Sequence, residues 1–288
     1  MFDLGGCSQA CADGVRKAVG MTSSRMSSCG EPEPLDTFAD DDLYDLGLRT
    51  EVSAWRAMAQ ARDSRFQLFP GVAVLTYPGE HGVNWCNGLL DPRLGQAPEP
   101  AIVVETLESA GISAGVESFR ASVHESETGV RAELVNRGCG VNVVNRAMRM
   151  TLDAFWPPTP SPAMETATWS EYVAFRVSHE GTQAAVLDGV DPEAFNVVGA
   201  RRGDEIVSIG LSHYQNGDVG IFDLMTIESQ RRRGFGSAVV ARLLREAKDR
   251  GCETGSVTSS PAAEDLYFDL GFRDFGAVLE CVRRTGKD

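Results

Sequence analysis

Alternating apolar and polar residues give the clearest pattern in the C-terminal part of the chain. Residues 205–214 and 219–227 are strand-like runs, and Asn216-Gly217 between them is typical of a tight hairpin turn, because both residues tolerate positive φ. From residue 237 to residue 250 the apolar residues recur on one face of a helix, which Gly251 ends. The pattern predicts a hairpin followed, after a turn, by an amphipathic helix.

A strand, a helix and a last strand are predicted after this helix. Residues 254–259 form a short strand pattern. Residues 261–270 have the pattern of a helix, with Pro261 near its first turn and Gly271 as its C-terminal stop. Residues 272–282 supply the closing strand.

The same order recurs more faintly in the first half of the chain. The expected elements are strands at 82–91, 115–123 and 140–150, and helices at 100–111 and 130–138. Helix, glycine and strand follow one another at 133–144 as they do at 265–278, and Cys139, expected to be buried packing, stands where the later copy has Phe272. We interpret this half as a degenerate copy of the second. Periodicity alone does not distinguish it from an unrelated α/β domain.

Two changes in composition divide the chain. Residues 1–34 are rich in Gly, Ser, Cys and Met and are expected to form a flexible leader, with Met21 and Met26 as alternative natural starts. Residues 156–169 hold four prolines within six residues, which disfavours helix and central strand and predicts a linker. The expected domains are therefore 35–155 and 170–288.

The charge and composition exclude several classes of function. The formal net charge of -14 argues against a nucleic-acid surface, which needs a concentrated basic face, and suits a cationic acceptor such as an amine. No run approaches the roughly 20 apolar residues of a membrane span, and the N-terminus lacks the apolar region of a secretory signal. We therefore expect no nucleic-acid partner and no membrane partner.

The cysteines indicate a compartment rather than a metal site. Seven of them are scattered along the chain, which fits a reducing cytoplasm better than a disulfide framework. Cys7 and Cys11 form an isolated pair without a second ligand pair at suitable spacing, so no metal is expected.

The turn before the amphipathic helix carries the candidate chemistry. A strand ending at Ile227, a turn with Gly234 and Gly236, and a helix beginning near Ser237 form an anion site, because free backbone N–H groups and the positive end of the helix dipole face the turn. Glycines allow close backbone approach, and the three arginines 231–233 add attraction for phosphate. The alternative interpretation is a solvated turn, since a glycine pattern alone is weak.

The residues around this turn resemble the GNAT N-acetyltransferase superfamily. The sequence Arg231-Arg232-Arg233-Gly234-Phe235-Gly236 matches the family's acetyl-CoA signature, which is Gln or Arg, two residues, Gly, one residue, and Gly or Ala. A second motif, Leu-Tyr followed by Leu-Gly-Phe, is matched at 266–272, and the close resemblance covers about 195–283. The resemblance implies an α/β (α+β) GNAT fold, a mixed, mostly antiparallel twisted sheet flanked by helices, with two tandem GNAT-like domains.

The resemblance also implies roles for single residues. The strand residues Met225, Thr226 and Ile227 would pair with the pantetheine arm of acetyl-CoA. The cradle for its pyrophosphate would come from the turn and helix start, namely Arg231, Arg232, Arg233, Gly234, Phe235, Gly236 and Ser237. Ser260 stands where the family often has an Asn that contacts pantetheine.

The catalytic candidates are Tyr267 and Asp223. Tyr267, in the Leu-Tyr motif, would protonate the departing thiolate of coenzyme A as general acid; outside the motif it would be read as helix packing. For the general base Asp223 is placed first, ahead of Glu228 and His213. Each of these three has the alternative reading of a surface or hairpin residue.

The expected function is direct transfer of the acetyl group from acetyl-CoA, as co-substrate and without a metal, to a primary amine of a small molecule or peptide. The alternative is a non-catalytic acyl-CoA-binding regulatory module, and an unrelated nucleotide-binding domain is poorly supported because no Gly-Lys-Ser/Thr phosphate loop is present. The first half has one Gly and three prolines in its turn, "DPRLGQAPEP", so it is not expected to bind acetyl-CoA in the same way. The acceptor, the acyl length and the oligomeric state have no signal in the sequence.

Overall fold

The computed structural model describes residues 38–283 except 62, 78–84, 117, 154, 156–163 and 181–186. The predicted leader and most of the predicted linker lie outside the described residues. The end of the predicted linker has regular structure, because residues 164–166 form a strand and Trp169 begins a helix.

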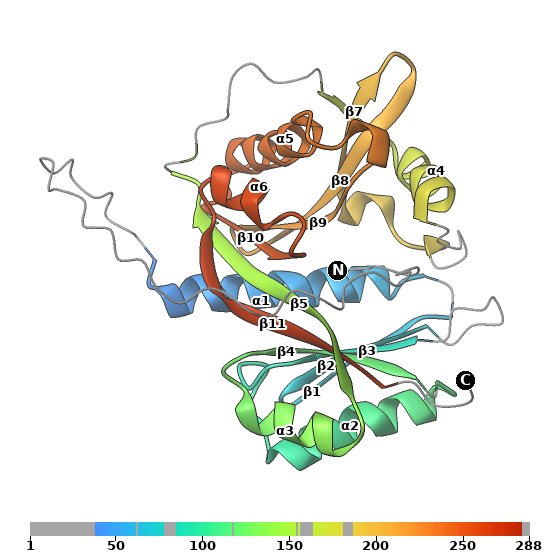
Figure 1. The fold of residues 1–288 in the computed structure, drawn as a ribbon, viewed down its shortest axis with the longest axis vertical. Helices are drawn as coiled ribbons and strands as arrows, with labels where there is room; N and C mark the ends of the chain where they lie inside the picture. Colours follow the sequence, from blue (N-terminus) through green and yellow to red (C-terminus); the bar gives the residue numbers. More distant parts are fainter. Residues whose placement is uncertain are drawn as a thin grey trace, which may run out of the picture.

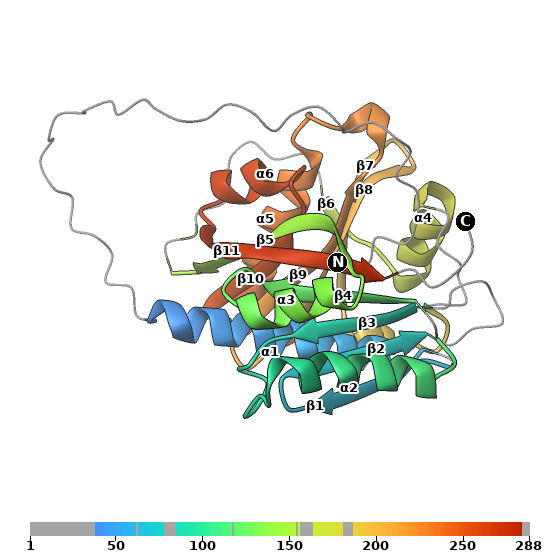
Figure 2. The same cartoon turned by 60° about the horizontal axis from the view of Figure 1, so that its bottom comes forward.

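One mixed sheet runs through the molecule (Figures 1 and 2), with the strand order β1-β2-β3-β4-β11-β5-β10-β9-β8-β7-β6. Its strands are β1 (Arg65–Phe69), β2 (Val72–Tyr77), β3 (Trp85–Leu90), β4 (Phe119–His124), β5 (Gly140–Thr151), β6 (Met164–Thr166), β7 (Asn196–Arg202), β8 (Glu205–Gln215), β9 (Asp218–Thr226), β10 (Thr254–Ser259) and β11 (Arg273–Arg283). Within this sheet β3 is parallel to β4 and β10 is parallel to β9, and the other neighbouring pairs are antiparallel. The expected mixed, mostly antiparallel sheet is confirmed.

Helices cover both faces of the sheet. They are α1 (Asp40–Met58), α2 (Pro100–Ser113), α3 (Thr128–Asn136), α4 (Trp169–Glu180), α5 (Phe235–Asp249) and α6 (Glu264–Asp269), with the short 3-10 helices η2 (Pro192–Ala194) and η3 (Glu228–Gln230). Leu75 of β2 packs in one core with α1 and α4, whereas its neighbour Val74 packs in another core with α2 and α3. Because neighbouring strand residues point to opposite faces, α1 and α4 share one face, and α2, α3, α5 and α6 lie on the other.

Both halves of the chain repeat one order of elements. A strand, a helix, a parallel strand, a short helix and a long strand follow one another as β3-α2-β4-α3-β5 and as β9-α5-β10-α6-β11. The loop that precedes each long strand is closed alike: Cys139 N–H donates to Leu134 O and Phe272 N–H donates to Tyr267 O, both at 3.0 Å. Cys139 is buried, as expected. The family origin of the first half stays a prediction.

The two long strands connect the halves. β5, from the first half, lies between β11 and β10, and β11, from the second half, lies between β4 and β5. Each half therefore completes the sheet of the other. α1 crosses the seam, which is the region where strands of the two halves lie side by side, and contacts β2, β5, β8, β9 and β10.

Candidate acyl-CoA site

The parallel strands β9 and β10 separate partway along their length. Their pairing begins at Asp218 and Thr254 and ends at Gly220 and Ser256. Beyond this point β9 continues to pair with β8, and β10 continues to pair with β5. The residues of β9 from Ile221 to Thr226 therefore turn one strand edge toward a gap, where backbone N–H and C=O groups can receive an extended ligand.

A β-bulge shapes β9 within this gap. The register against β8 shifts between Ile209 and Leu211, which face Met225 and Phe222. Asp223, inside the bulge, has φ of 49°, a left-handed conformation that Asp and Asn adopt more readily than most residues. The bulge interrupts the pairing of β9 with β8. Met225 and Thr226, the predicted pantetheine contacts, follow the bulge and lie beside the gap.

The turn after β9 brings a helix N-terminus to the same place. Arg232 and Gly234 have φ of 61° and 81°, and Gly234 is the N-cap of α5. No side chain caps this end, so the first N–H groups of α5, from Phe235 to Ser237, keep their capacity to bind an anion. The site thus combines a strand gap with a helix N-terminus.

The glycines of the turn have different physical roles. At Gly234 a Cβ would meet open space, so its positive φ is what favours glycine there. At Gly236 a Cβ would lie 3.1 Å from Leu266 Cδ1 and 3.5 Å from Thr226 Oγ1, so close packing of α5 against α6 and β9 favours glycine. Arg231, Arg232 and Arg233 are exposed, and Arg231 Nε donates to Thr226 O at 3.2 Å.

Tyr267 lies on α6 in the core beneath α5. Its side chain is 3% exposed and meets Phe272 edge to face, with ring centroids 5.3 Å apart. Burial raises the pKa of the Tyr267 phenol above its usual value, so the phenol is neutral near pH 7. Ser260 follows the end of β10, at the level where β9 and β10 are apart.

The three base candidates differ in their surroundings. The Asp223 carboxylate, whose side chain is 5% exposed, accepts a hydrogen bond from Tyr172 O–H at 2.5 Å and pairs with the buried Arg176 guanidinium. His213 is buried between Ala194 O (2.8 Å) and Ser53 Oγ (2.9 Å), and burial lowers its pKa. Glu228 is exposed. Tyr172 and Arg176 of α4 were missed by the sequence reading, because the helix pattern does not reveal that they reach the bulge.

The first half differs from this geometry in its strand pairing, in the first residue of its helix and in its loop contact. β3 and β4 stay paired from Cys86 and Phe119 to Leu90 and Val123, so no gap opens between them. The helix after β3 begins with Pro100, and Leu134 makes the loop contact that Tyr267 makes in the second half.

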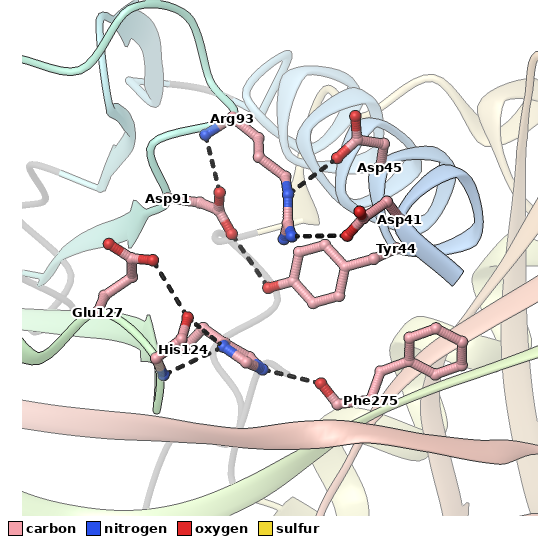
Figure 3. A network of polar contacts seen from close by, with 9 residues as sticks. Asp41, Tyr44, Asp45, Asp91, Arg93, His124, Glu127 and Phe275 are labelled. Carbon is pink, nitrogen blue, oxygen red and sulfur yellow. Dashed lines mark hydrogen bonds and ion pairs between the residues drawn. The ribbon is translucent and has the colours of Figure 1, made fainter. Parts of the chain in front are cut away.

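The turn after β3 makes polar contacts with α1, whereas the turn after β9 leads to the uncapped N-terminus of α5 (Figure 3). Tyr44 O–H donates to Asp91 Oδ2 at 3.0 Å, and Arg93 pairs with Asp41 and Asp45 of α1 at 3.4 and 3.2 Å. Across the same region His124, at the end of β4, contacts Phe275 O of β11 at 2.8 Å. The buried carboxylate of Asp91 stands in this turn, where it would repel a phosphate.

Comparison with known families agrees with this geometry. The family model of the acetyltransferase (GNAT) family matches residues 148–272, which include β9, β10, the bulge and the turn. These residues are a GNAT domain. The match begins inside β5 and ends at Phe272, so it includes the Leu-Tyr motif of α6.

Solved GNAT structures share the fold over a longer stretch of chain. A GCN5-related N-acetyltransferase from Kribbella flavida is 15% identical, with a TM-score of 0.60 over 84% of this chain and 97% of its own. One from Sphaerobacter thermophilus is 16% identical, with a TM-score of 0.52 over 77% and 84%. A GCN5-related glucosamine N-acetyltransferase region of a fungal multi-domain β-N-acetylglucosaminidase is 14% identical, with a TM-score of 0.54 over 86% and 38%. At these identities the likeness concerns the fold. Comparison with curated proteins gave no sequence match.

Among the described residues, no helix is long and apolar enough to cross a membrane. In the same part of the chain, no group of three or more His, Cys, Asp or Glu side chains is placed to hold a metal ion. Cys7 and Cys11 lie outside the described residues.

Proposed function

We propose that the protein is an acetyl-CoA-dependent N-acetyltransferase that acts on a primary amine of a small molecule or peptide. The observation that carries the proposal is the gap between β9 and β10, which opens beside the uncapped N-terminus of α5 within a GNAT domain. The family supports acyl transfer in general; acetyl as the acyl group and an amine as the acceptor are our inference. The scattered cysteines favour the cytoplasm as the compartment.

The binding half of the mechanism follows from the backbone. The pyrophosphate of acetyl-CoA would accept hydrogen bonds from the first N–H groups of α5, with the arginines of the turn adding positive charge. The pantetheine arm would pair with the chain from Met225, near the end of β9, to Ile227, just after it, and Ser260, which follows β10, would contact the arm from the other side of the gap. The thioester would then lie in the gap, near the bulge.

The chemical step is a direct transfer. The amine lone pair attacks the thioester carbonyl carbon, the carbonyl π electrons move to oxygen, and a β9 backbone N–H stabilises that oxyanion. Collapse breaks the C–S bond, and the thiolate takes a proton from Tyr267, which burial keeps protonated. The amine loses its proton to a base, for which Asp223 stays the first candidate. Its ion pair with Arg176 gives it a competing structural role.

Replacing Tyr267 by Phe tests the catalytic proposal. The ring keeps its packing against Phe272, so we expect unchanged acetyl-CoA affinity and a kcat about 100-fold lower, the usual scale for loss of a general acid. Release of free coenzyme A thiol with a panel of primary amines measures kcat, and calorimetry measures affinity. A wild-type protein that binds acetyl-CoA but turns over with no amine would favour the alternative, a non-catalytic acyl-CoA-binding module.

A further inference from the structure

A small polar cavity lies beneath α1, where the two halves meet. It measures about 20 Å³, and its lining includes Glu51 and Trp55 of α1, Arg120 of β4, Asn145 of β5, Thr258 of β10 and Glu280 of β11. A volume of this size holds one water-sized group. Both halves of the chain contribute walls, so the cavity exists only in the assembled sheet.

Among the uncharged side chains of this lining, two buried polar atoms have no hydrogen-bond partner. They are Trp55 Nε1, which can only donate, and Asn145 Oδ1, which can only accept. Trp55 is 5% exposed and Asn145 is 3% exposed. Buried polar atoms are nearly always satisfied in folded proteins, so an unmatched donor and an unmatched acceptor in one cavity indicate an occupant.

Carboxylates complete the wall. Glu51 Oε2 accepts from Thr258 Oγ1 at 3.2 Å, and Glu280 Oε1 accepts from Asn142 Nδ2 at 2.8 Å. Arg120 lies 3.5 Å from Glu280, so one of the two carboxylates has a cation beside it. An occupant that accepts from Trp55 and donates to Asn145 or to a carboxylate is a hydroxyl group or a water molecule.

The cavity lies at the level of the proposed reaction. Arg146 pairs with Ser259, so Asn145 lies one residue beyond the end of β10, level with position 260. The register of β10 against β9, with Ser256 beside Gly220, places position 260 level with position 224, inside the bulge. Thr258 faces α1, on the side of the sheet opposite to α5.

We propose that this cavity is a subsite for the acceptor and that it takes a hydroxyl group, so that the acceptor is a hydroxylated amine. The inference rests on the proposed function, which supplies the amine and the site of reaction. Trp55, Asn145 and Glu51 are then specificity-determining residues, two of them supplied by α1.

Matched amines test the subsite. The series HO-(CH₂)n-NH₂ is compared with CH₃-(CH₂)n-NH₂ for chains of about two to six methylenes, because a site built to hydrogen-bond a hydroxyl discriminates against the analogue without it. We expect the wild type to prefer the best hydroxylated amine by about 10- to 100-fold in kcat/KM. In Trp55→Phe, which keeps an aromatic ring, the preference should fall about tenfold, because kcat/KM falls more for the hydroxylated amines than for the alkylamines. Thr76→Val is the control, since Thr76 Oγ1 is also buried without a partner but does not line the cavity, and it should keep the full preference.

Binding is measured beside turnover, by calorimetry of each amine with and without coenzyme A. Equal kcat/KM and equal affinity for the two series overturn the subsite, as does a Trp55→Phe variant that weakens both series alike; the cavity then holds a bound water only. Failure of the proposed function looks different, because acetyl-CoA itself would not bind. The amine affinities still report on the subsite in that case.

Discussion

At the scale of single residues, the bulge of β9 depends on a buried ion pair. Asp223 and Arg176 have side chains that are 5% and 2% exposed, and Tyr172 O–H adds a third group, with its pKa raised by burial and by the Asp223 charge. An isolated buried charge costs far more than a paired one. The pair therefore holds α4 against the strand that would carry the acyl group.

Replacing Asp223 by Asn tests this anchor. Asn tolerates the positive φ of 49° and keeps the side-chain shape, so the change isolates the charge. We expect a loss of about 3 kcal/mol in the free energy of unfolding, measured with denaturant, because Arg176 stays buried without its partner. The double variant Asp223→Asn/Arg176→Met should lose less free energy of unfolding than the sum of the losses in its two single variants. Additive losses would contradict the role of the ion pair as an anchor.

At the scale of elements, α1 approaches the sheet closely through a glycine. A Cβ on Gly47 would lie 2.1 Å from Nε of the buried Arg149, whose NH1 donates to Val257 O at 3.0 Å. Burial lowers the pKa of Arg149. The close fit keeps α1 over the seam, where it lines the cavity described above.

Gly47→Ala measures how tightly α1 fits. Alanine is favoured in a helix by about 1 kcal/mol, but displacing a buried guanidinium costs about 1–3 kcal/mol, so we expect net destabilisation in denaturant unfolding. Gly111→Ala in α2 is the matched control, because its Cβ would meet neighbours at ordinary distances of 3.4 Å. That control should be neutral or stabilised. A stabilised Gly47→Ala protein would contradict the close contact.

Much of the second half could be predicted from local pattern. Periodicity and turn chemistry predict the hairpin around Asn216-Gly217, the helix after the turn and the helix at 264–269, which a glycine ends. The acetyl-CoA signature at 231–236 indicated the turn that caps α5. The ion pair of Asp223 with Arg176 could not be predicted, because it joins elements that come together only in the folded sheet. The same holds for α1, which was not expected, and for the exchange of β5 and β11, since pairing between distant strands leaves no local signal.

At the scale of the whole molecule, the exchanged strands make the halves dependent on each other. β5 has β11 and β10 as neighbours, both from the second half, and β11 has β4 and β5, both from the first. Separating the halves would expose the backbone edges of these long strands and the apolar residues beneath α1. We therefore expect that the two halves are not independently stable.

Cooperative unfolding tests this dependence. We expect one two-state transition for the whole chain, with calorimetric and van't Hoff enthalpies in agreement. Fragments 38–155 and 164–283, expressed separately, should lack a cooperative transition and should regain one when mixed. A fragment that unfolds cooperatively alone would contradict the account.

The most direct test of the central claim is calorimetric titration of the protein with acetyl-CoA, beside two matched variants. Gly234 is the N-cap of α5 and Gly251 follows its C-cap, with φ of 81° and 85°, and a Cβ at either would meet open space. We expect one site per chain in the wild type, lost in Gly234→Asp because its carboxylate repels the pyrophosphate, and kept in Gly251→Asp. No binding to the wild type, two sites per chain, or full affinity in Gly234→Asp would contradict the acyl-CoA site described here.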